Sequence, residues 1–168
     1  LLCFSHRFPT KAMTRKLTLL AVIALLALPA AANAYLPPGF IGISPQNAAN
    51  ASDFELMQDA NVESLRLPLY WSAIESKEPY LADPDWSDFD REVELAAEAE
   101  MRVMPFVLST PDWVAPETID LPVQTPWQRS AWVSFLRAAV ERYGPEGEFW
   151  EEHPDLPFLP IHRWEIWN

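Results

Sequence analysis

The chain has few of the residues that support disulfide, thiol or metal chemistry. Its 168 residues include one cysteine, Cys3, and three histidines. Cys3 precedes the segment predicted below to be the mature chain, which then has no thiol nucleophile, no disulfide and no cysteine-bound metal. Two histidines remain, His153 and His162, and neither has a companion at ligand spacing. We therefore expect no metal site and no cofactor.

Basic residues are also scarce. The sequence has 12 Lys and Arg against 24 Asp and Glu, and four of the basic residues lie before position 35. Eight basic and 24 acidic residues are left after that point, a formal balance of −16. Such a charge repels nucleic acid and anionic membranes. Eight tryptophans, all after position 70, offer flat apolar faces of the kind on which neutral sugars stack. We expect a neutral polysaccharide or oligosaccharide partner.

The first 34 residues have the pattern of a targeting segment. Met13 begins a short basic stretch, a run of twelve residues that are apolar except for Thr18 covers 17–28, and Ala32-Asn33-Ala34 fits the small-x-small cleavage rule. Twelve residues span about 18 Å of a membrane core of about 30 Å, too little for an anchor. The pattern predicts a secretory signal peptide over 13–34, a secreted or periplasmic protein, and no membrane association after cleavage. Residues 1–12 are expected to be upstream or read-through sequence.

The remaining segment, 35–168, alternates strand-like and helix-like stretches. Predicted strands are 40–43, 62–68, 102–108 and 161–167. Predicted helices are 52–60, opened by a Ser52–Glu55 capping box, 87–100, capped by Ser87 or Asp88, and 125–143, opened by Thr125, Pro126 and Gln128. Asn61 and Gly144 are expected to end helices. Pro105, inside the third strand, is unfavourable because proline removes a donor from the ladder.

This order predicts an α/β fold with parallel strands and right-handed crossovers. A closed eight-stranded barrel and an open doubly wound sheet share the pattern. No G-x-G-x-x-G or P-loop follows a strand, and long loops follow the second and third strands, as in barrel enzymes. A (β/α)8 barrel takes about 250 residues. We therefore expect a TIM barrel truncated to about four strands and three helices.

In a barrel, residues at the carboxyl ends of strands face the active site. This rule selects Ser44–Asn47, Arg66–Trp71, Ser109–Trp113 and Asn168. Arg66 lies inside an apolar strand and needs a carboxylate partner. It forms either a structural ion pair or an orienting contact to a catalytic carboxylate. Trp71 and Trp113 are candidates for sugar stacking or for the core.

The same residues resemble a known family. Gly42, Arg66 with Trp71 beyond it, and the run Trp164-Glu165-Ile166-Trp167-Asn168 are similar to the first half of a cellulase-type glycoside hydrolase of the (β/α)8-barrel clan, families 5 and 39. The resemblance covers about residues 40–168. It implies that Arg66 matches the active-site arginine of the clan and that Asn168 matches the asparagine that binds the sugar 2-hydroxyl. The acid/base glutamate would be the residue after Asn168, and the nucleophile would lie on strand seven.

The resemblance therefore implies a fragment of a retaining O-glycosyl hydrolase, inactive alone because neither catalytic glutamate is in the sequence. Glu165 is a poor substitute, since a mid-strand carboxylate is usually paired structurally, here with Arg66 or Arg163. Two alternatives remain open. One is a non-catalytic carbohydrate-binding or scaffold protein, and the other is a different parallel α/β enzyme.

Overall fold

The structure is a computed structural model that describes residues 36–117 and 119–167. The predicted upstream segment, 1–12, and the signal peptide, 13–34, lie outside the described residues, as does Asn168. Within these residues, four strands and five helices follow one another: β1 Gly42–Ile43, α2 Ala51–Asp59, β2 Ser64–Tyr70, α3 Trp71–Ile74, α4 Ser87–Glu98, β3 Arg102–Leu108, α5 Pro126–Tyr143, α6 Glu148–Glu152 and β4 Glu165–Ile166.

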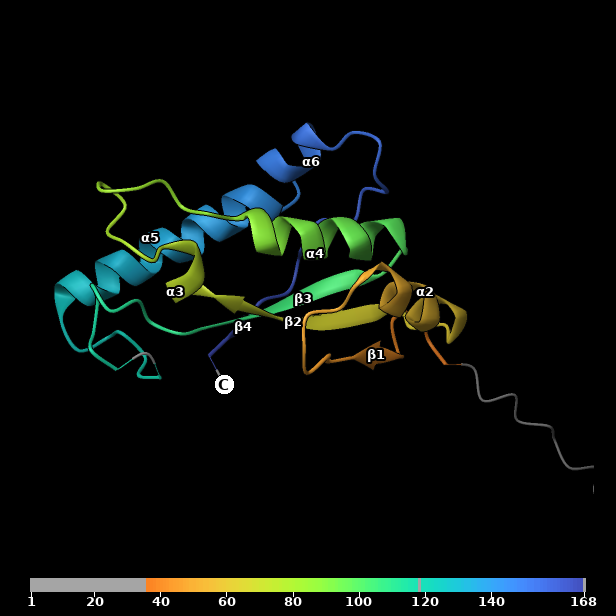
Figure 1. The fold of residues 1–168 in the computed structure, drawn as a ribbon, viewed down its shortest axis with the longest axis horizontal. Coiled ribbons are helices and arrows are strands. Elements are labelled where there is room, and N and C mark those ends of the chain that lie inside the picture. Colours follow the sequence, from red (N-terminus) through yellow and green to blue (C-terminus); the bar gives the residue numbers. More distant parts are fainter. Residues whose placement is uncertain (1–35, 118, 168) are drawn as a thin grey trace, which may run out of the picture. The chain divides into compact units, whose positions relative to one another are not determined.

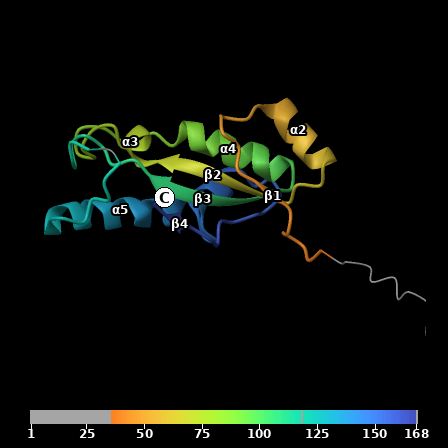
Figure 2. The same ribbon diagram turned by 90° about the horizontal axis from the view of Figure 1, so that it is seen from below.

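The four strands form one parallel sheet in the order β1-β2-β3-β4. The long helices α4 and α5 cover one face of the sheet (Figure 1). Figure 2 looks onto the opposite face, which no described helix crosses. A doubly wound sheet reverses its strand order and carries helices on both faces, whereas a barrel keeps sequential order and places its helices outside. The predicted fold class, a truncated (β/α)8 barrel, is therefore confirmed.

The core lies between the sheet and the helices. Side chains alternate along β2, where Leu65, Leu67 and Leu69 are buried and the residues between them are partly exposed. On α4 the buried residues are Phe89, Val93, Ala96 and Ala97. On α5 they are Trp132, Phe135, Ala139 and Tyr143, and Val140 is 47% exposed.

Helix ends show where local signals held. Thr125 caps α5, and the Gln128 side chain returns a hydrogen bond to its backbone, as predicted. Asn61 is left-handed, with φ 56°. The predicted Ser52 cap is wrong. The cap of α2 is Asn50, two residues before Ser52, and it forms a reciprocal capping box with Asp53. The α4 cap is also misassigned, since Asp85 accepts from Ser87 before the helix begins.

Gly144 ends α5, but its φ of −71° is not left-handed. Its role is a close approach, because a Cβ there would lie 2.6 Å from the Val140 carbonyl oxygen. The connection that follows, 145–160, contains α6, whose Phe149 and Trp150 are buried. The predicted strand 161–167 is paired only at 165–166, because the backbone N–H of Ile161 instead donates to the Tyr143 carbonyl at 2.9 Å.

Pro68 in β2 and Pro105 in β3 lie at positions where the neighbouring strand offers no acceptor, so the missing N–H costs no ladder hydrogen bond. Ser44 Oγ donates to the Arg66 carbonyl, so that carbonyl faces β1, and Pro68 two residues later faces the same edge after β1 has ended. Val107 accepts from the Trp167 N–H on the β4 side. Pro105 therefore faces β4 one position before the first β3–β4 pair, Phe106 with Glu165.

Candidate functional site

The sheet face without helices carries the side chains that a closed barrel would enclose. On β2 these are Arg66, Pro68 and Tyr70, and on β3 they are Met104, Phe106 and Leu108, by alternation with the buried residues. Tyr70 stands at the carboxyl end of β2 and is 47% exposed. In a barrel this end of the sheet is where catalytic sites form.

An ion pair crosses this face. Arg66 donates from Nε to Glu165 Oε2 at 2.7 Å and from Nη2 to Oε1 at 2.8 Å. Its guanidinium lies 3.8 Å from the centre of the Phe106 ring, and Phe106 pairs with Glu165 in the sheet register. Glu165 thus provides the carboxylate that Arg66 was predicted to need. Of the two arginines predicted as partners of Glu165, the structure pairs it with Arg66 and not with Arg163.

The pair keeps both groups ionised. Hydrogen bonding to Glu165 raises the Arg66 pKa, and the bonds from Arg66 lower the Glu165 pKa. Both side chains remain about a quarter to a third exposed, at 26% and 32%. A glutamate with a lowered pKa has no proton to give near neutral pH, so Glu165 is unsuited to general-acid chemistry. The geometry instead suits a fixed ion pair that provides charge below the carboxyl ends of the strands.

Trp71 is not available to a ligand. It is fully buried, with its ring against Trp132 and Phe135 at centroid distances of 5.2 and 5.3 Å, and its indole N–H donates to Glu75 Oε2 at 2.7 Å. The predicted substrate-binding role of Trp71 therefore needs correction: in this structure its ring packs in the core. The physical reason is that β2 passes directly into α3, which turns the side chain toward α5.

Trp113 is half-buried after β3, close to a second tryptophan. Its indole N–H donates to the Glu75 carbonyl at 2.7 Å, and its ring meets the Trp127 ring edge-on at 6.0 Å. Trp127, in the first turn of α5, is 52% exposed. Trp127 was not among the site residues predicted from the sequence.

Tyr70, within the predicted range Arg66–Trp71, lies on the same face of β2 as Arg66. One further residue, Glu75, was missed. Glu75 is 8% exposed, and burial raises its pKa while the Trp71 hydrogen bond lowers it. No sequence pattern predicted the burial of Glu75, because that burial depends on contact with Trp113, which lies 38 residues later in the sequence.

Asn168 lies outside the described residues, but the chain leading to it is placed. The Trp167 N–H donates to the Val107 carbonyl at 2.9 Å, and the Trp167 ring meets the Trp132 ring edge-on at 6.0 Å. The last described residue is therefore held beside the carboxyl end of β3. Of the predicted positions, the structure brings Arg66 and the β4 segment together and separates Trp71 from them.

The described residues contain no group of metal ligands and no membrane-spanning helix. Among residues 36–117 and 119–167, no three His, Cys, Asp or Glu side chains are grouped to hold a metal ion. His153 packs on the Phe149 ring at 4.5 Å, and His162 is exposed. No helix in that part of the chain is long and apolar enough to cross a membrane.

Comparison with known proteins supports the fold alone. The sequence matches no family model and no curated protein. Among solved structures, a family 39 glycoside hydrolase from the gut symbiont Bacteroides cellulosilyticus WH2 is similar, with a TM-score of 0.54 and 18% identity over 78% of this chain. A beta-amylase catalytic domain from Paenibacillus polymyxa is a weaker match, with a TM-score of 0.35 and 19% identity over 61% of this chain. The chain spans 24% of the length of each. The first of these similarities shows that the described residues have the fold of part of a (β/α)8 barrel.

Proposed function

We propose that the chain is the amino-terminal half of the barrel of a secreted glycoside hydrolase that cleaves O-glycosidic bonds with retention. The observation that carries the proposal is the Arg66–Glu165 pair on the barrel-interior face, directly below the strand ends that lead to Tyr70 and Asn168. The similarity in fold to a family 39 glycoside hydrolase supports it.

In this proposal each residue has a separate role. Asn168 binds the 2-hydroxyl of the sugar that is cleaved, and Arg66 maintains the positive charge near the catalytic carboxylates. The acid/base and the nucleophile are two glutamates from the protein beyond Asn168, about 5–5.5 Å apart as retention requires. Trp113, with Trp127 beside it, gives an aromatic surface for a neutral polysaccharide or oligosaccharide.

The test compares two proteins. The segment 35–168 alone should release no aryl group from chromogenic aryl glycosides, because it contains neither carboxylate. A protein that continues past Asn168 and includes the later strands should release it, with the product keeping the anomeric configuration of the substrate. Turnover by the segment alone would contradict the assignment, and inversion by the longer protein would contradict the mechanism.

The rival proposal is a non-catalytic carbohydrate-binding protein. The exposed Trp127 beside Trp113 is the observation that favours it. Binding of a neutral oligosaccharide without hydrolysis by the longer protein would support the rival.

A further inference from the structure

A cavity of about 450 Å³ lies beside β2, where this strand continues past the end of β1. It is separate from the Arg66–Glu165 pair on the interior face described above. Its walls come from the segment 45–49 before α2, the end of β2, α3, and the first turns of α4. The volume lies in the range of small-molecule pockets, roughly 300–1,000 Å³. Neither the Arg66–Glu165 pair nor Trp113 lines it.

The cavity follows from how short β1 is. β1 pairs with β2 only at Gly42–Ser64 and Ile43–Leu65, and one further contact joins Ser44 Oγ to the Arg66 carbonyl at 3.3 Å. Beyond that point Pro68 offers no donor, so nothing holds the chain against β2. The segment 45–49 therefore stands away from the strand before Asn50 starts α2, and the space between is the cavity.

The cavity combines an apolar floor with donors and acceptors at its walls. Leu67, Leu69, Ile74 and Phe89 form apolar lining. Gln46, Asn47 and Arg91 supply donors, and Asp85, Asp88 and Glu92 supply acceptors. A sugar ring needs this mixture, because its hydroxyls donate and accept while its C–H faces are apolar.

Of the three acidic residues that line the cavity, Asp85 and Asp88 are exposed and Glu92 is half-buried. The Glu92 pKa is raised by burial and then by the charge of Asp88, with Arg91 acting in the opposite direction and no hydrogen bond contributing. Asp88 and Glu92 lie four residues apart on α4, a spacing at which like charges destabilise a helix. A ligand hydroxyl that donates to Glu92 would compensate its loss of water.

We propose that this cavity is a binding site for a neutral saccharide unit, separate from the strand ends at which hydrolysis would take place. An anionic ligand is disfavoured by the acidic lining and by the formal charge of −12. An organic cation is the competing ligand, because three carboxylates and one guanidinium line the cavity, and the spermidine arm of the test below distinguishes it. The choice of a sugar rests on the proposed function, while the cavity and its chemistry do not.

The test uses the full chain and saturation-transfer NMR with methyl glycosides of glucose, xylose, mannose and galactose and their β-linked disaccharides. We expect transfer to at least one of them at millimolar concentration. Glu92→Gln keeps an acceptor of the same shape and should change the dissociation constant by less than about threefold. Glu92→Leu removes the acceptor and should weaken binding by about tenfold or more.

Glu98→Leu is the matched control, because Glu98 is exposed on the same helix and does not line the cavity. Thermal unfolding of each variant by circular dichroism verifies that the helix is intact. No transfer to any sugar, or equal loss in the Glu92→Leu and Glu98→Leu variants, overturns the proposal. So does binding of spermidine that disappears in Glu92→Gln, since that result identifies a cation site.

The two proposals fail separately. If a longer protein hydrolyses glycosides but sugar binding does not depend on Glu92, only the cavity assignment is lost. If the chain binds sugar through Glu92 but the longer protein cleaves no glycoside, only the proposed hydrolysis is lost.

Discussion

Arg66 on β2 and Glu165 on β4 form a two-point ion pair across the intervening strand β3, although 99 residues separate them in sequence. The pair joins the second and fourth strands on the face that a barrel would enclose, with Phe106 beneath the guanidinium. Because β4 pairs with β3 over only two residues, this contact is a main tie between β4 and the rest of the sheet.

Removing the guanidinium should change how Glu165 titrates. In Arg66→Met we expect the Glu165 pKa to rise toward its usual value, because the hydrogen bonds that lower it are lost. A group with a lowered folded pKa adds stability above its unfolded pKa and loses it as pH falls through the folded pKa. The stability difference between wild type and variant should therefore shrink on acidification. Carboxyl ¹³C NMR and urea unfolding at several pH values measure both effects.

Arg163→Met is the control for that measurement, because Arg163 is exposed, lies two residues from Glu165, and forms no ion pair with it in the described residues. An unchanged Glu165 titration in Arg66→Met, or an equal change in Arg163→Met, would contradict the assigned pair.

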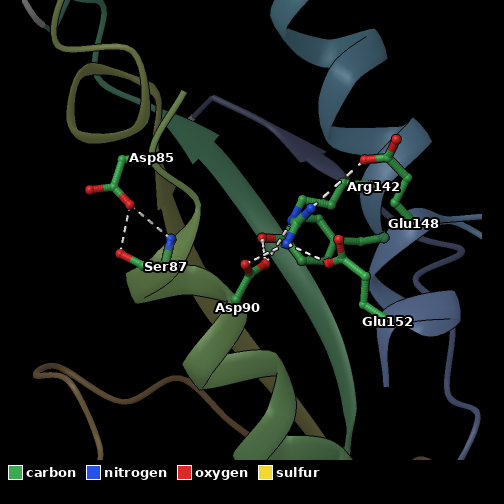
Figure 3. Close-up of polar contacts among 7 residues, drawn as sticks. Asp85, Ser87, Asp90, Arg142, Glu148 and Glu152 are labelled. Atoms are coloured by element: carbon green, nitrogen blue, oxygen red, sulfur yellow. Dashed lines mark hydrogen bonds and ion pairs between the residues drawn. The ribbon is translucent and has the colours of Figure 1, made fainter. Parts of the chain in front are cut away.

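A second charged cluster holds the helices together (Figure 3). Arg142 on α5 binds both oxygens of Asp90 on α4 at 2.8 and 2.6 Å, and the buried Tyr143 hydroxyl donates to Asp90 at 2.6 Å. Burial and the Asp90 hydrogen bond raise the Tyr143 pKa, and Asp90 raises that of Arg142. Glu152 on α6 lies 3.2 Å from the same guanidinium.

Asp90→Ala should be the most destabilising polar change in this cluster. It leaves a mostly buried guanidinium and a buried hydroxyl without their shared acceptor, and we expect a loss of about 2–4 kcal/mol, below the fully buried case because Arg142 keeps some solvent contact. Tyr143→Phe should lose about 1 kcal/mol. Glu148→Gln, whose side chain is 77% exposed at 3.9 Å, should change stability by less than about 0.5 kcal/mol. Urea unfolding would rank the three, and a different order would refute the assigned roles.

Much of this architecture could be predicted locally. The bounds of β3 and the capping of α5 by Thr125 and Gln128 depend on residues within one or two turns, and both were predicted. The Asn50 cap was missed because two overlapping cap signals, at Asn50 and Ser52, compete within three residues.

The candidate site was harder to predict, because contacts distant in sequence decide which side chains are free. Trp71 was a candidate for sugar stacking or for the core, and Trp132 and Phe135 of α5 cover it. Glu75 is enclosed by contacts with Trp71 and Trp113. The ion pair of Arg66 with a carboxylate was predicted, since an arginine inside an apolar strand needs such a partner.

Glu75 gives a prediction with the opposite pH dependence to that of Glu165. Its pKa is raised mainly by burial, so its contribution to stability is present below its usual pKa and is lost as pH rises through the folded value. Glu75→Gln keeps an acceptor for the Trp71 N–H without the charge, and its stability relative to wild type should increase as pH rises from 4 to 7. Glu75→Leu should lose about 1–3 kcal/mol by leaving that N–H unpaired. Glu98→Gln, at an exposed position, should show neither trend.

The proposed role of Asn168 can be isolated with a substrate that lacks the group it binds. In a protein that continues past Asn168, Asn168→Ala should lower kcat for an aryl glycoside by about 100-fold or more, because hydrogen bonds to the 2-hydroxyl strengthen in the transition state. For the matching 2-deoxy glycoside the same substitution should change kcat by less than about threefold, since no hydroxyl is there to bind. An equal loss on both substrates would mean that Asn168 supports the fold or a neighbouring glutamate, because a direct contact to the 2-hydroxyl predicts that the two losses differ.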